Sequence, residues 1–240
     1  MSLTATPDGV LLVDKAPGMT SHDVVALVRR QLQIKKVGHC GTLDPIATGL
    51  LILTLGRGTK IQDLLMSEDK EYVGTLKLGQ TTDTQDRAGK VLEERPVPEL
   101  SEESVTAAFD NFRGDFYQMP PMVSAIKQGG VPLYKLARQG KVVEREPRLV
   151  HVYRYSIDRI GAPEIDFTVM CSKGFYVRTY AHDIGEKLGC GAHLQELRRT
   201  RSGRFDLTRA VTVDAIKNDP PVDILEKILT LPEVSRMRGA

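Results

Sequence analysis

The chain has 240 residues, of which 41% are hydrophobic and 27% are charged, with 33 Lys and Arg against 31 Asp and Glu. This composition is typical of a soluble globular protein with a proper core, and it excludes disorder as the dominant state, because the hydrophobic content is ordinary and the net charge of +2 is small. The length fits one large domain or two small ones, and the overall charge gives no sign of a nucleic-acid-binding protein.

The chain is predicted to begin with a strand and a helix. Gly9–Lys15 is a short apolar run closed by a Pro-Gly pair, which favours a buried strand followed by a turn. Ser21 is the expected N-cap of a helix whose apolar residues, at positions 24, 25, 28 and 32, recur at helical spacing. Gly56–Lys60 lacks the spacing of a phosphate-binding loop, so we expect a turn and the start of a helix there.

The middle of the chain is predicted to hold a strand and two helices. Glu71–Gln80 is the expected strand, and it ends in a polar turn. Ser101–Arg113 has apolar residues at helical spacing and two glutamates near its N-terminal end, where the helix dipole favours acids. Gly114 ends this helix, and a shorter helix is predicted for Leu133–Gln139.

The last part of the chain is predicted to hold two strands, Leu149–Ile160 and Ile165–Cys171, and then a helix over 177–188. A small C-terminal helix is expected over Val222–Thr230. Because strands and helices do not alternate regularly, the order favours a mixed sheet over a doubly wound parallel one.

The chain has three cysteines, Cys40, Cys171 and Cys190. A small, odd number of cysteines does not indicate a disulfide framework, which favours a reducing compartment. The first seven residues lack the charged and apolar parts of a signal peptide. The longest apolar run, 50–55, is far shorter than the roughly 18 residues that cross a bilayer. We therefore expect a cytoplasmic protein without a membrane segment.

Charge is distributed unevenly along the chain. Residues 83–115 have a net charge of −5, whereas 124–159 have +5 and 171–209 have +4. Basic segments such as Leu197–Phe205 could neutralise phosphates, although the same pattern is also typical of a solvated surface of mixed charge.

Glycine and proline are densest in the segment 38–49, GHCGTLDPIATG, which holds a single carboxylate, Asp44. A residue before proline is disfavoured in the helical region, and flanking glycines allow close approach of the backbone. Such a loop could present Asp44 to a ligand, or Asp-Pro could simply form a turn.

Two other kinds of site are not expected. Cys171, His182, Cys190 and His193 lack the two tight pairs that announce a structural zinc site. No G-x-S-x-G elbow of a serine hydrolase occurs. His151 is predicted to be a hydrogen-bonded strand residue, and no metal is expected.

Four segments in collinear order resemble the TruB-type tRNA pseudouridine synthases. They are GVLLVDKAPGMTSHDVV (9–25), GHCGTLDPIATGLL (38–51), EYVGTLKLGQTTDTQD (71–86) and CSKGFYVRTYAHDIGEKLGCGAHLQELRRTRSG (171–203). The similarity spans roughly 9–203 and includes PPMVSAIKQGGVPLYKLARQG (120–140). Four ordered motifs make a chance resemblance very unlikely, and G-T-L-D-P is more specific than a bare carboxylate loop.

The resemblance implies an α+β pseudouridine synthase fold, with a mixed, mostly antiparallel sheet flanked by helices. It implies a catalytic domain over 1–210 with an RNA-contacting insertion at about 120–150. Residues 211–240 are expected to form a short tail with a helix, because they are too few for the PUA domain that often follows in this family. The implied protein is a monomeric, stand-alone enzyme of the bacterial type.

The implied reaction converts uridine to pseudouridine at position 55 in the T loop of tRNA, with no cofactor or metal. Asp44 corresponds to the family's nucleophile, which attacks the sugar or the base, or stabilises charge near C1′. Arg178 corresponds to the arginine that keeps this carboxylate ionised, and Tyr72 to the tyrosine that stacks on the flipped base. Without the resemblance, Arg178 would be interpreted as a surface arginine and Tyr72 equally well as a core residue.

The other implied site residues bind substrate or support the loop. Lys15 would support the Asp44 loop, and His39 would face the RNA where the base is extruded. Asp86 would contact RNA or orient its neighbours. Tyr176 would lie near the Asp–Arg pair, and Leu197 would form an apolar wall against the base.

Two alternative functions remain open from the sequence. One is a pseudouridine synthase that acts on another RNA site. The other is a non-catalytic RNA-binding or RNA-folding module on the same scaffold. Asp44, Tyr72 and Arg178 occurring together favour catalysis, because a pure binder would need none of the three.

Overall fold

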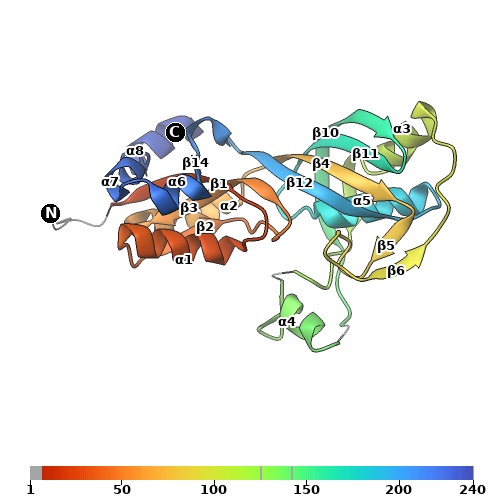
Figure 1. The fold of residues 1–240 in the computed structure, drawn as a ribbon, viewed down its shortest axis with the longest axis horizontal. Helices are drawn as coiled ribbons and strands as arrows, with labels where there is room; N and C mark the ends of the chain where they lie inside the picture. Colours follow the sequence, from red (N-terminus) through yellow and green to blue (C-terminus); the bar gives the residue numbers. More distant parts are fainter. Residues whose placement is uncertain (1–6, 125, 142, 240) are drawn as a thin grey trace. The chain divides into compact units, whose positions relative to one another are not determined.

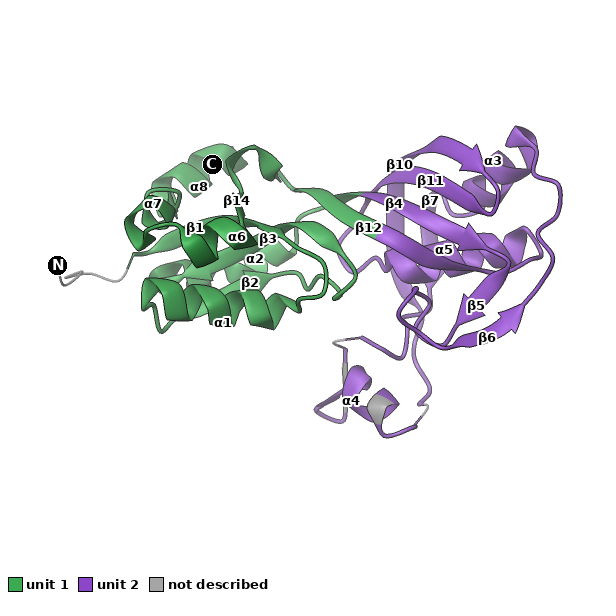
Figure 2. Ribbon diagram, in the orientation of Figure 1, with its two compact units in different colours: residues 1–72, 197–240 green, residues 73–196 purple. Residues whose placement is uncertain are grey.

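The computed structural model describes residues 7–124, 126–141 and 143–239. The chain divides into two compact units, one formed by residues 1–72 with 197–240 and the other by residues 73–196 (Figure 2). Strands β4 and β12 carry the chain across the two boundaries, so each of them has residues in both units.

Unit 1 holds the N-terminal and C-terminal elements of the chain (Figures 1 and 2). They are β1 (Gly9–Lys15), α1 (Ser21–Leu32), β2 (Val37–Cys40), β3 (Thr48–Leu55), the 3-10 helix η1 (Gly56–Ile61), α2 (Gln62–Met66), β13 (Phe205–Asp206), the 3-10 helix η2 (Leu207–Arg209), β14 (Val211–Thr212), α6 (Val213–Asn218), α7 (Pro221–Leu225), β15 (Leu229–Thr230) and α8 (Leu231–Arg238).

The sheet of unit 1 is built around two apolar strands. β1 and β3 are antiparallel over their whole length, from Gly9 opposite Leu55 to Lys15 opposite Gly49. The strand order is β14-β1-β3-β12, and both the β1–β14 and the β3–β12 pairs are parallel. Nearly all of β3 is buried, which is why its sequence is continuously apolar rather than alternating.

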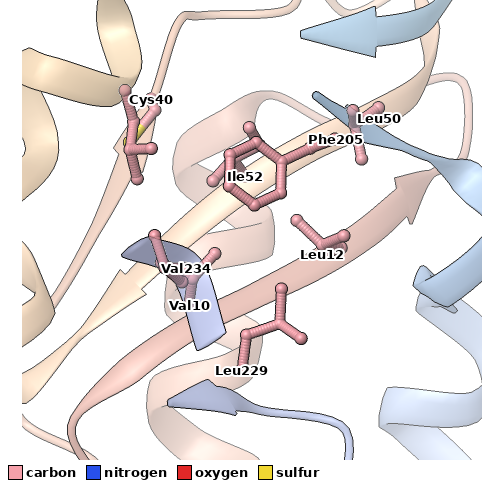
Figure 3. Packing of buried hydrophobic residues seen from close by; sticks show 9 residues of the cluster. Val10, Leu12, Cys40, Leu50, Ile52, Phe205, Leu229 and Val234 are labelled. Carbon is pink, nitrogen blue, oxygen red and sulfur yellow. The ribbon is translucent and has the colours of Figure 1, made fainter. Parts of the chain in front are cut away.

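One face of this sheet is covered by an apolar cluster (Figure 3). Val10 and Leu12 of β1 and Leu50 and Ile52 of β3 pack there with Phe205, and all five are essentially inaccessible to solvent. Burial of such side chains is the dominant stabilising contribution in a unit of this size. The cluster also includes Cys40 of β2, so it contacts both strands that the Asp44 loop connects.

Unit 2 holds the middle of the chain, with part of the two shared strands. Its elements are β4 (Lys70–Leu78), β5 (Gln80–Thr82), β6 (Val91–Glu94), α3 (Glu102–Asp110), β7 (Gly114–Gln118), β8 (Lys127–Gln128), β9 (Val131–Pro132), α4 (Leu133–Arg138), β10 (Arg148–Gly161), β11 (Glu164–Cys171), α5 (Val177–Lys187) and β12 (Ala192–Ser202). The strand order is β12-β4-β11-β10-β7, and β10 is antiparallel to both of its neighbours.

Aromatic packing holds α3 and α5 to the sheet of unit 2. Phe109 of α3 lies 5.9 Å from Phe167 of β11 and 5.7 Å from Tyr180 of α5, measured between ring centroids. Edge-to-face pairs at these distances are favourable beyond the area they bury. The amphipathic pattern predicted for α3 and α5 is therefore confirmed, and α5 is anchored in the core.

The mixed, mostly antiparallel α+β architecture predicted from the sequence is confirmed, with two local differences. The N-cap of α1 is Thr20 rather than Ser21: its hydroxyl accepts from the Asp23 backbone, and the Asp23 side chain bonds back to Thr20. Such a reciprocal capping box satisfies backbone donors that a lone serine would leave open. Ser21 is instead buried and bonded to Leu43.

The second difference lies near the C-terminus. The predicted helix Val222–Thr230 is wrong in extent, because α7 ends at Leu225. Leu229 and Thr230 form β15, which is antiparallel to the start of β1, and Leu229 is fully buried. Tertiary pairing overrides the local helical pattern here. None of the helices in the described ranges is long and apolar enough to span a membrane.

Candidate active site

The Asp44 loop joins β2 to β3 in unit 1, and backbone groups hold it in place. The Gly18 amide donates to the Pro45 carbonyl at 2.8 Å, and the Ala47 amide donates to the Asp44 carbonyl at 3.0 Å. The Ser21 hydroxyl accepts from the Leu43 amide at 2.9 Å and donates to the Leu43 carbonyl at 3.2 Å. The residue that presents the carboxylate is therefore held on both sides.

Lys15, the last residue of β1, lies against this loop. Its side chain is 1% exposed, and its ammonium donates to the carbonyl oxygens of Ala16 at 3.0 Å, Met19 at 2.8 Å and Pro45 at 3.5 Å. Burial lowers the pKa of Lys15 to about 8, although the Asp44 carboxylate opposes this by favouring the charged form. Lys15 thus places a positive charge next to Asp44.

Arg199 is a support of the same loop that sequence reasoning did not single out. It is 1% exposed, and its guanidinium donates to the carbonyls of Leu50 at 2.7 Å and Gly41 at 3.2 Å. Its neighbour Arg198 pairs with Asp14 at 3.0 and 2.7 Å. These two arginines of the basic run Leu197–Phe205, which could have bound phosphates, are engaged within unit 1.

Position 49, just after the loop, must be glycine because β12 passes very close to its backbone. Its φ is +94°, and a Cβ placed there would lie 2.3 Å from the Arg199 carbonyl oxygen. Any other residue would therefore clash with the strand that carries Arg199. The glycine of the motif thus lets the Asp44 loop close against β12.

His39 of β2 has a neutral imidazole at physiological pH. Its ring lies edge-on to His22, 5.0 Å away between centroids, and its Nδ1 is buried with no hydrogen-bond partner in the described part of the chain. Burial, followed by the charges of His22 and Arg199, lowers the pKa of His39 from 6.5 to about 4. The structure therefore makes His39 neutral and leaves a ring nitrogen unused.

Acid should destabilise the fold through His39. Because its pKa is lower in the folded state, the unfolded chain binds the extra proton between about pH 6.5 and 4, and stability falls as the pH drops through this window. We expect His39→Gln to reduce the loss of unfolding free energy between pH 7 and 4 by on the order of 2 kcal/mol. Urea unfolding at both pH values measures this, and an unchanged acid dependence would contradict it.

Tyr72 of β4 and Leu197 of β12 both belong to unit 1. Tyr72 is 8% exposed and Leu197 is 7% exposed, so each shows only a small part of its side chain to solvent. The strands are linked next to Tyr72, where the Thr200 hydroxyl contacts the Glu71 carboxylate at 3.1 Å. Both positions lie on strands of the sheet.

Arg178 lies in the first turn of α5 in unit 2 and is 3% exposed. Its guanidinium donates to the carbonyls of Thr84 at 2.9 Å and Val123 at 2.7 Å, and its Nε lies 3.9 Å from Oδ2 of Asp86. The alternative of a surface arginine is therefore excluded. Arg178 joins α5, the loop 82–86 and the segment that follows β7.

Asp86 is buried in its own loop. Its carboxylate accepts from the Thr84 hydroxyl at 2.7 Å and from the Ala88 amide at 3.0 Å, and its carbonyl accepts from the Thr82 hydroxyl at 2.7 Å. Together with Arg178, which lies close to the second carboxylate oxygen, these contacts fix the Asp86 side chain within unit 2.

Tyr176 is the N-cap residue of α5, and its backbone is bonded to the side chain of Gln118. Thr179, also in the first turn of α5, donates to the Gln85 side chain at 2.8 Å. Sequence reasoning missed Gln118, Gln85 and Thr179, because an isolated polar residue in a strand, loop or helix gives no sign of its partner.

Two of the histidines discussed above, His193 and His151, have polar protein neighbours. His193 Nδ1 lies 3.2 Å from the Gln80 carbonyl and its Nε2 lies 3.3 Å from the Gln195 side chain. His151 Nδ1 lies 2.7 Å from the Asp115 carboxylate across β7 and β10, as expected of a hydrogen-bonded strand residue. Among the described residues, no three His, Cys, Asp or Glu side chains gather as metal ligands would.

Comparison with known families covers residues 29–222 without a gap. Residues 29–177 match the N-terminal domain of the TruB family pseudouridylate synthases, and residues 178–222 match the C-terminal domain of tRNA pseudouridylate synthase B. The chain belongs to the TruB family. The family predicted from the four motifs is confirmed, and the enzyme is an isomerase of the tRNA pseudouridine synthase B type.

Relatives of known sequence are similar over most of their length. The tRNA pseudouridine synthase B of Opitutus terrae is 54% identical over 222 residues, which are 92% of each chain. That of Syntrophotalea carbinolica is 50% identical over 229 residues, covering 95% of this chain and 75% of the relative. The family resemblance therefore includes the Asp44 loop and α5 in a single alignment.

Solved structures share the fold. A chain of a Cbf5–Nop10–Gar1 complex is 30% identical, with a TM-score of 0.73, over 95% of this chain and 62% of that one. A chain of an H/ACA RNP bound to a substrate RNA containing 2′-deoxyuridine is 28% identical, with a TM-score of 0.67, over 92% and 58%. The TruB chain spans about six-tenths of the length of these solved chains.

Proposed function

We propose that this TruB enzyme isomerises uridine 55 in the T loop of tRNA to pseudouridine, with Asp44 as the nucleophile and no cofactor. The observation that carries the proposal is the Asp44 loop. Its carboxylate belongs to a segment held on one side by Ser21 and on the other by the Gly18 amide, with the buried ammonium of Lys15 beside it. A preorganised carboxylate beside a buried cation suits a nucleophile that must remain ionised.

The proposed reaction rearranges bonds without net gain or loss of atoms. The C1′–N1 glycosidic bond breaks, the uracil rotates, and a C1′–C5 bond forms. The proton on C5 is then lost, while N1 finishes with a proton. Asp44 either forms a transient covalent bond with the sugar or base, or stabilises the positive charge that develops near C1′.

The remaining site residues divide between holding the base and supplying charge. In unit 1, Tyr72 and Leu197 offer an aromatic and an apolar surface to a uracil that is no longer bonded to its sugar. In unit 2, the buried guanidinium of Arg178 keeps its positive charge at every physiological pH. His39, which is neutral and partly covered, is available to contact the RNA around the extruded base.

The segment between β7 and β10 is the proposed contact for the T arm. Lys135 and Lys141 are exposed within this segment, and Arg148 is exposed where β10 begins. The segment that connects the two strands therefore carries positive side chains at the surface. Cations of this kind bind phosphates without reading sequence, so they position the RNA while Tyr72 and its neighbours recognise the base.

Mapping pseudouridine in an unmodified tRNA transcript after incubation with the enzyme tests the function. Modification at position 55 is the expected result. Modification elsewhere would favour the alternative of another RNA site, and binding without modification would favour the non-catalytic module. The proposal fails on either of the last two outcomes.

Salt should weaken tRNA binding steeply. Each phosphate contact releases a condensed counterion, so three contacts predict a loss of affinity of about 30-fold between 50 and 200 mM KCl. Lys135→Ala should reduce the slope of log K against log salt by about 1, whereas Lys227→Ala, at an exposed position in unit 1, should not change it. Filter binding at several salt concentrations measures both slopes, and a flat dependence would contradict the proposed phosphate contacts.

A further inference from the structure

Gln118 is the last residue of β7 and is 2% exposed. Its side-chain amide makes two hydrogen bonds to the backbone of a single residue, Tyr176. The Tyr176 amide donates to Oε1 at 2.8 Å, and Nε2 donates to the Tyr176 carbonyl at 3.0 Å. The side chain of Gln118 thus satisfies both backbone groups of Tyr176.

Tyr176 is the point at which α5 begins. The Tyr176 side chain makes no capping hydrogen bond, and the Tyr176 carbonyl also accepts the first helical bond, from the Tyr180 amide at 3.0 Å. The bonds to Gln118 therefore take the place of a cap. Because Arg178 is two residues further along, the position of its backbone depends on the peptide that Gln118 holds.

Gln118 also directly precedes the segment between β7 and β10 that is proposed to contact RNA. The chain leaves β7 directly after it and returns at Arg148, the first residue of β10. Five residues after Gln118, the Val123 carbonyl accepts from the Arg178 guanidinium at 2.7 Å. The start of this segment is therefore bonded to the beginning of α5 at two points, Gln118 with Tyr176 and Val123 with Arg178.

We propose that Gln118 is a positioning residue for the isomerisation: by fixing Tyr176 it sets the first turn of α5 and the guanidinium of Arg178. The role rests on the proposed function of Arg178. Gln118 itself acts through its backbone bonds to Tyr176 and is not one of the reacting groups. Without it, the Tyr176 amide would lose its partner inside the protein, and the first turn would be free to shift.

The experiment compares Gln118→Ala with Gln80→Ala. Gln80 is a matched control, because its side-chain amide donates to the Glu94 carboxylate in a hydrogen bond that is exposed to solvent. Two quantities are measured: the hydrogen exchange rate of the Tyr176 amide, and kcat and KM on a T-arm RNA. Small displacements of a positioned group cost about 100-fold in rate.

We expect Gln118→Ala to accelerate exchange at Tyr176 and to lower kcat by about 100-fold, with KM within about threefold of the wild type. Gln80→Ala should change none of these. Exchange at Tyr176 as slow as in the wild type, or a kcat within twofold of it, would overturn the proposal. The exchange measurement needs no activity, so a wild-type enzyme that forms no pseudouridine would refute the proposed function separately.

Gln118→Glu provides a second variant if the alanine variant does not fold. An ionised glutamate can accept from the Tyr176 amide but repels its carbonyl, whereas a protonated glutamate can donate to that carbonyl as glutamine does. The kcat of Gln118→Glu relative to the wild type should therefore rise as the pH is lowered, with KM unchanged. A ratio that does not change with pH would overturn the role of the Tyr176 carbonyl bond.

Discussion

Asp44→Asn is expected to lower kcat by at least about 10⁴-fold while tRNA binds with a Kd within about threefold of the wild type. An amide is neither a nucleophile nor a negative charge that can stabilise a developing cation, so the chemical step loses its central group. Binding survives because the loop is held by main-chain groups and by Ser21, which the substitution keeps. Single-turnover kinetics with a T-arm RNA, together with filter binding, separates the two effects.

Asp63→Asn is the matched control, because Asp63 is an exposed carboxylate in α2 of the same unit. Its kcat should remain at the wild-type value. Residual activity above about 1% in Asp44→Asn, beyond what contaminating wild-type enzyme explains, would remove Asp44 from the role of nucleophile. A parallel loss of tRNA binding would show instead that the carboxylate is needed to form the complex.

Arg178→Lys is expected to lower kcat by about 100- to 1,000-fold and the free energy of unfolding by about 2 kcal/mol. An ammonium cannot reach the carbonyls of Thr84 and Val123 together, as the forked guanidinium does, so a buried carbonyl loses its partner. The positive charge is kept, so a large effect would show that the geometry of the guanidinium matters. Urea unfolding and steady-state kinetics measure the two quantities.

The control for this substitution is Arg57→Lys. Arg57 is largely exposed and pairs with Asp8 at the surface, where ion pairs contribute little to stability. Both kinetics and stability should stay near wild-type values. Arg178→Lys with wild-type kcat would mean that charge alone is sufficient and would weaken the inference about Gln118 as well.

Much of the fold could be predicted from local pattern. The apolar run of β1 and the amphipathic stripe of α3 each match the structure closely, because these elements bury the face that their periodicity marks. Leu229 could not be placed by pattern, since a helical and a strand environment suit it equally and only pairing with β1 decides. The prediction that Ser21 is the N-cap of α1 was wrong, because its actual partner, Leu43, is 22 residues away and local pattern does not reveal it.

The candidate site depended more on resemblance than on pattern. Asp44 stands out in its glycine-rich loop, but spacing alone does not distinguish a catalytic carboxylate from an Asp-Pro turn. The role of Arg199 could be recognised only in the structure. In the sequence, an arginine whose guanidinium bonds to buried carbonyls cannot be distinguished from one that faces solvent. Gln118 gave no signal at all, since both of its bonds join it to a residue 58 positions further along the chain.

Release of tritium from tRNA labelled at C5 of its uridines tests the central proposal most directly, because the proposed reaction expels the C5 proton of the uridine that it converts. With an unmodified transcript, the account predicts release of one equivalent of tritium per tRNA by the wild-type enzyme and none by Asp44→Asn. A transcript with cytidine at position 55 should release none with either protein. Release that persists with cytidine at position 55, or the absence of release by the wild-type enzyme, would contradict the account.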